Sequence, residues 1–103
     1  MKIIEYYTDK ILEEIKDAKN YAMKALELRD TDPDQAHELY ELSVEEMGHM
    51  SRLHGLVVKI IEKYREENGE PSADMQARYN YRHKEAIEKA AKVKNLQTMF
   101  NEK

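Results

Sequence analysis

The chain has 103 residues, a formal net charge of −4 at pH 7 and no cysteine. Ala, Glu, Lys, Leu and Arg supply 49 of the 103 residues, against three Gly and two Pro, a bias typical of long helices that excludes sandwiches, barrels and α/β sheets. The lack of cysteine excludes disulfides, thiolate nucleophiles and cysteine-based zinc sites, and the acidic balance gives no electrostatic case for nucleic-acid binding.

Length and hydropathy predict one all-α domain over residues 1–103. No stretch approaches the roughly 20 apolar residues that a membrane span needs. The first residues carry no apolar signal segment, so we expect a cytoplasmic protein without membrane contacts. Long helices with 37% charged residues make a thin core, which favours self-association.

Two short breaks divide the sequence into three helical segments. At the first break, Asp32 is a good N-cap and Pro33 suits the first helical position. At the second, Asn68-Gly69 ends a helix, and Pro71 or Ser72 begins the next. Because both connections are short, we expect three long antiparallel helices, as in an up-down bundle. Their predicted ranges are about 2–29, 33–68 and 73–100.

Each predicted helix has an inward stripe with alternating spacings of three and four residues, the pattern of a face that packs on neighbouring helices. The first stripe consists of Ile4, Tyr7, Ile11, Glu14, Ala18, Tyr21, Ala25 and Leu28. The second consists of Ala36, Leu39, Ser43, Glu46, Met50, Leu53, Val57, Ile60 and Tyr64. The third consists of Tyr79, His83, Ala86, Ala90, Val93, Gln97 and Phe100. One glutamate interrupts each of the first two stripes near its middle.

These two glutamates, Glu14 and Glu46, need an explanation because a buried unpaired carboxylate costs several kcal/mol. A bound cation, a buried Lys or Arg, or water at a bundle end would each offset the free-energy cost of burying these carboxylates. Glu46 also shares a helix face with His49, three residues on, in a second inward row. That row comprises Leu42, Glu46, His49, Leu53, Leu56 and Ile60.

Helix geometry places these three side chains at nearly one height. The first helix rises about 25 Å from Glu14 to the turn near residue 31, and the second descends about 20 Å to Glu46 and about 24 Å to His49. Two carboxylates and one imidazole converging inside a bundle form half of a carboxylate-bridged dimetal site, with ligands that suit iron or manganese.

The set Glu14, Tyr21 and Glu46-x-x-His49 resembles the first half of the ferritin-like superfamily, which includes ferritins, bacterioferritins and rubrerythrins. The resemblance covers roughly residues 7 to 60. It implies that Glu14 is a terminal metal ligand, Glu46 a bridging ligand and His49 the imidazole ligand, with Tyr21 as a catalytic phenol beside them. The implied metal is a di-iron pair, with manganese as the second option.

The sequence departs from that family in its second half. A full ferritin-like subunit has four helices, whereas one further helix follows here, and its inward stripe has no Asp or Glu. The missing ligands must then come from another subunit. A short subunit with a site completed in this way resembles the encapsulated ferritins. This resemblance implies a half-bundle completed by oligomerisation into at least a homodimer, and ferroxidase-type oxidation of Fe²⁺ by O₂ or peroxide. The sequence leaves open whether an encapsulating shell is a further partner.

Other interpretations remain open. The chain fits a metal-free helical module that oligomerises through its stripes, and more weakly a structural manganese or zinc bundle. Gly48 and Gly55, with Ser51 between them, favour close approach of another backbone, either the third helix or a partner subunit, with local flexibility of the helix as the competing interpretation. His54 and His83 have no Glu three positions earlier, so we interpret them as core histidines rather than ligands.

Overall fold

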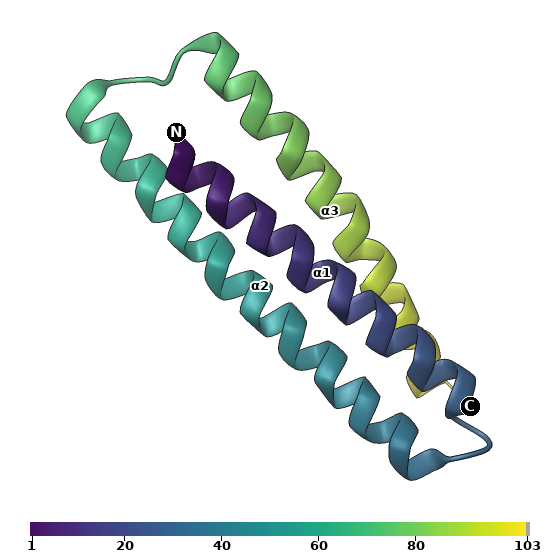
Figure 1. The fold of residues 1–103 in the computed structure, drawn as a ribbon. Helices are drawn as coiled ribbons and strands as arrows, with labels where there is room; N and C mark the ends of the chain where they lie inside the picture. The colour runs from purple at the N-terminus through teal and green to yellow at the C-terminus, as the bar shows by residue number, and fades with distance from the viewer. Residues whose placement is uncertain (103) are drawn as a thin grey trace.

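The structure is a computed structural model that describes residues 1–102, and it consists of three long helices (Figure 1). Helix α1 spans Lys2–Leu28, α2 spans Pro33–Asn68 and α3 spans Ala73–Asn101. The prediction of an all-α chain with three helices is confirmed, with bounds that agree to within one or two residues, and no strand occurs within the described residues. No helix in that part of the chain is long and apolar enough to cross a membrane.

The helix ends form where the sequence places capping groups. The carboxylate of Asp32 accepts a hydrogen bond of 3.2 Å from the backbone N–H of Gln35, which satisfies one of the free donors at the start of α2. Gly69, with φ 78°, ends α2 in a conformation that disfavours other residues. Ser72 rather than Pro71 caps α3, because its hydroxyl accepts from the backbone N–H of the third residue on.

Figure 1 shows α2 running back alongside α1, and α3 running back again on another side of α1. Helix α1 packs most extensively against α2 and less against α3, whereas α2 and α3 lie farther apart. The resulting molecule is elongated, with extents of 55 × 19 × 18 Å. Helix α1 is therefore the element that both other helices use to bury apolar surface.

The buried core follows the predicted stripes, with two additions on α1. Most predicted stripe residues are buried or half-buried. Ile15 and Ala22 are also fully buried although they lie outside the predicted stripe. They extend the buried face of α1 because this helix contacts two neighbours, so its apolar sector is wider than a single stripe.

One buried hydroxyl joins all three helices. Ser43 of α2 is fully buried, and its hydroxyl donates to the backbone carbonyl of Ala18 on α1 at 2.7 Å. The same hydroxyl accepts a hydrogen bond of 2.9 Å from the side-chain amide of Gln97 on α3. A polar group in a dry core is tolerated when its bonds are satisfied, so this bridge fixes the relative heights of the helices that carry the candidate site.

Candidate metal centre

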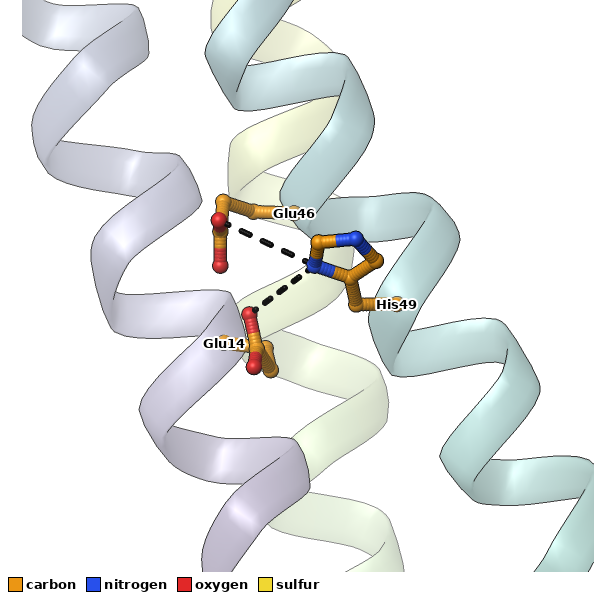
Figure 2. Close-up of side chains that lie close together, drawn as sticks. All are labelled: Glu14, Glu46 and His49. Atoms are coloured by element: carbon orange, nitrogen blue, oxygen red, sulfur yellow. Dashed lines mark ion pairs between the residues drawn. The ribbon is translucent and has the colours of Figure 1, made fainter.

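Glu14, Glu46 and His49 converge between α1 and α2 (Figure 2). Glu14 comes from the middle of α1, and the other two residues lie one turn apart on α2. Nδ1 of His49 lies 3.7 Å from Oε2 of Glu14 and 3.8 Å from Oε1 of Glu46. One ligand atom from each residue lies within 4.8 Å of the other two. The structure thus brings together the three residues selected from the sequence, whose role as metal ligands stays a prediction.

The two glutamates are largely withdrawn from solvent. Their side chains are 25% exposed for Glu14 and 20% for Glu46. Oε2 of Glu14 is buried and has no hydrogen-bond partner among the described residues. Buried polar atoms in folded proteins are nearly always paired. An unpaired carboxylate oxygen aimed at a second carboxylate and an imidazole is the arrangement expected where a cation supplies the missing interaction.

His49 is largely exposed, so the prediction that it lies in an inward row of its helix is wrong. Its side chain is 54% exposed, and Leu42 and Leu56 of the same predicted inward row are 37% and 43% exposed. In Figure 2, α3 passes behind the three side chains. Leu42, His49 and Leu56 therefore lie along an open side of the α1–α2 pair, whereas Leu53 and Ile60 of the same row pack against the core. The periodicity of α2 identified a common face without identifying which part of it is covered.

The donor set fits a first-row transition metal. The separations of 3.7 and 3.8 Å are too long for hydrogen bonds. Ligand atoms about 2.1 Å from one ion stand roughly 3 to 4 Å from one another, so a small rotation of the carboxylates would close this set around an ion. Two carboxylate oxygens with one imidazole nitrogen suit iron or manganese. The residues present therefore fit half of a dimetal centre.

Tyr21 lies on α1 two turns beyond Glu14, about 10 Å further along the axis. Its side chain is half-buried. No hydrogen bond among the described residues joins its hydroxyl to Glu14, Glu46 or His49. The catalytic role implied for Tyr21 by the family resemblance stays a prediction.

His54 and His83 form a separate pair between α2 and α3. Their rings stack with centroids 5.3 Å apart and an interplanar angle of 15°, and Tyr79 meets the His83 ring edge-on. Burial raises the pKa of Tyr79 above its ordinary value of 10.0. Both histidines are half-buried, and their interpretation as core histidines stays a prediction. Their stacking could not be predicted, because it depends on the relative heights of α2 and α3.

Gly48 and Gly55 do not serve contacts within the chain. A Cβ atom built on either glycine would meet no atom within 4 Å. The expectation that the third helix approaches them closely is therefore wrong, since α3 packs on a different side of α2. Approach of a partner subunit at these glycines stays a prediction.

Comparisons of the chain with protein-family models, with curated proteins and with solved structures found no match.

Proposed function

We propose that this protein is a ferritin-like subunit that binds a pair of ferrous ions at a site shared between two copies of the chain and oxidises them with O₂ or peroxide. Glu14, Glu46 and His49 of each copy hold the iron. The proposal includes the antiparallel half-bundle completed by oligomerisation that the family resemblance implies. Manganese is the second metal compatible with these ligands.

One observation carries the proposal. Oε2 of Glu14 is buried without a hydrogen-bond partner and points toward Glu46 and His49. A structural ion pair would place a Lys or Arg at this point, but the only basic group within ion-pair distance of Glu14 among residues 1–102 is the imidazole of His49. A cation bound among the three side chains would satisfy this oxygen and remove the cost of burying two carboxylates side by side.

The ligand count argues for a second copy. One chain supplies two carboxylates and one imidazole, whereas a di-iron centre of this class uses four carboxylates and two imidazoles. A two-fold axis beside His49 would double the set, because the same surface of each copy meets at such an interface. The exposed Leu42 and Leu56 on either side of His49 would supply apolar contacts around the shared centre.

The chemistry that this site supports is electron transfer from its metal substrate. Two ferrous ions release one electron each, and O₂ takes up both electrons with two protons to give hydrogen peroxide. When peroxide is the oxidant, it takes up one electron from each of two ferrous ions together with two protons, its O–O bond breaks and two water molecules form. Glu14 and Glu46 stabilise the more highly charged ferric product, since fixed negative charge in a partly desolvated site is most effective where positive charge increases. His49 binds as the neutral imidazole.

Iron binding and oxidation by the purified chain test this proposal. Fe²⁺ is added without oxygen, air is admitted, and the absorbance of ferric carboxylate species is followed at fixed protein concentration. We expect stoichiometric binding and oxidation by the wild type and by the control Glu45→Ala, which removes an exposed neighbouring glutamate. Glu46→Ala should lose both. Equal behaviour of Glu46→Ala and the wild type would rule out the proposed site.

A measurement of mass in solution tests the shared interface. We expect at least a dimer when iron is bound, at the protein concentration used for oxidation. A chain that binds iron stoichiometrically and stays monomeric would contradict the interface while leaving metal binding intact.

The exposed apolar residues favour a second candidate, a helical module that associates without metal. Leu42, Leu56 and Ile3 are each between 37% and 45% exposed, so these apolar side chains are available for contact with another chain. This candidate predicts a dimer of unchanged strength in the presence of a metal chelator and in Glu46→Ala. The ferritin-like proposal predicts that both conditions weaken the dimer.

A further inference from the structure

A groove of about 610 Å³ between α1 and α3 is lined by four lysines. Lys16 and Lys19 come from α1, and Lys89 and Lys92 come from α3. The groove is separate from the candidate metal centre, which lies between α1 and α2. The lining also contains Asp9 and Glu13, so its formal charge is positive in a chain whose formal net charge is −4.

The register of the two helices places these lysines opposite one another. The side-chain ion pair between Asp9 and Arg82 joins residues 73 positions apart. Arg29 donates to the backbone carbonyls of both Met99 and Glu102, which are 70 and 73 positions away, in keeping with an offset near 73. That offset puts Lys89 level with Lys16 and Lys92 level with Lys19. Positive charge therefore faces positive charge at two successive heights across the groove.

The acidic side chains of the groove are engaged elsewhere. Asp9 pairs with Arg82, and Glu13, the other acid in the lining, pairs with Lys10 on its own helix at 3.4 Å.

Of the four lysines, one has a partner for its charge. Lys89 pairs with Glu85 at 3.0 Å, whereas Lys16, Lys19 and Lys92 form no ion pair within residues 1–102. Like charges held close together repel, so the groove keeps a net positive charge that a bound anion would neutralise.

We propose that this groove binds a small multivalent anion of the oligophosphate class. Lysine ammonium groups bind phosphate as point charges. Residues three apart on a helix are separated by about 4.5 Å along its axis, and packed helices lie about 8–10 Å apart. These spacings place the four lysines around a volume suited to a short phosphate chain rather than to one monovalent ion.

The lining of the groove argues against nucleic acid as the ligand. Its apolar residues are Leu12 and Ile15, and it contains no aromatic side chain. Single-stranded nucleic acids are held largely by stacking of their bases on aromatic rings. The groove offers charge without a stacking surface, which selects for a ligand whose recognition depends on its phosphates alone.

Calorimetric titration with inorganic tripolyphosphate tests this proposal. The metal-free protein is used at low ionic strength, where exposed charges are least screened. We expect one tripolyphosphate per chain for the wild type and for the control Lys59→Gln/Lys63→Gln, which removes two exposed lysines of α2. Lys16→Gln/Lys92→Gln should bind about tenfold more weakly, and added salt should weaken the wild type in the same direction.

The following outcomes would overturn the proposal. The wild type failing to bind, or the two double variants binding alike, would show that the groove is not a specific site. Tighter binding of a single-stranded oligonucleotide than of tripolyphosphate would identify nucleic acid as the ligand instead. Without anion, Lys16→Gln/Lys92→Gln should melt at or above the wild-type temperature because repulsion is relieved. A lower melting temperature would contradict the charge argument.

Discussion

Because one oxygen of Glu14 is unpaired, we expect Glu14→Gln to change the free energy of unfolding in opposite directions without and with metal. In the metal-free protein, Oε2 of Glu14 is buried without a hydrogen bond, and an unsatisfied buried polar group costs about 1–3 kcal/mol. Glu14→Gln removes the charge and supplies an amide donor in a side chain whose end lies within 4.8 Å of a carboxylate oxygen of Glu46. We expect the free energy of unfolding of the metal-free variant to rise by about 1 kcal/mol, which is about 4–8 °C in Tm for a chain of this size.

Iron should reverse the order of the two proteins. At a free Fe²⁺ concentration of about 100 Kd, binding stabilises the folded wild type by about 2.7 kcal/mol, or roughly 10–20 °C in Tm. Glu14→Gln has lost a ligand and should gain little, so the two stability curves cross as iron is added.

Thermal unfolding without oxygen, at one protein concentration and with or without Fe²⁺, measures both effects. The control is Glu13→Gln, because Glu13 is 64% exposed and pairs with Lys10 on the surface of α1. It should follow the wild type in both conditions. A metal-free Glu14→Gln that is less stable than the wild type would refute the argument from the unpaired oxygen. An iron response equal to that of the wild type would refute the role of Glu14 as a ligand.

Three further predictions concern the bundle. Burial raises the pKa of Tyr79, so the stability that its neutral phenol contributes is complete below pH 10 and is lost as pH rises through the raised pKa. Urea unfolding on either side of pH 10 measures this loss. Tyr79→Phe should reduce it, whereas Tyr81→Phe, at an exposed position, should not. Gly48→Ala should raise Tm by about 4–8 °C, because Ala is favoured in a helix by about 1 kcal/mol and meets open space; loss of a dimer in this variant would show that a partner backbone packs there. Ser43→Ala should cost about 1–3 kcal/mol in chemical unfolding, because it leaves buried groups of α1 and α3 without their partner, whereas the exposed Ser51→Ala should change stability by less than about 0.5 kcal/mol.

Local signals in the sequence predicted the helices because helix ends depend on a few neighbouring residues. Asp32 and Ser72 cap α2 and α3 through hydrogen bonds that span three residues, so no tertiary information was needed. The burial of Ile15 and Ala22 could not be predicted in the same way. It depends on α1 packing against two helices at once, and a stripe drawn for one neighbour is too narrow for that.

The heights of Glu14, Glu46 and His49 could be predicted because the α1–α2 turn is short and each helix rises uniformly. The positions of the lysines across the α1–α3 groove could not. They depend on the path of the second connection and on contacts such as the one between Arg82 and Asp9, which join residues 73 positions apart. Helical periodicity assigns residues to faces, but it does not give the register between helices that are distant in sequence.

The outward position of His49 connects metal binding with self-association. Exposure increases across the site, from 20% and 25% at Glu46 and Glu14 to 54% at His49, so any coordination position that one chain leaves open faces the side that a second copy would cover. If both copies bind the same pair of ions, then by linkage each binding step strengthens the other by the same factor. The alternative candidate, a helical module without metal, also predicts a dimer, but one whose affinity for a second copy is independent of iron. The decisive quantity is therefore the change in dimer affinity on adding iron, rather than the existence of the dimer.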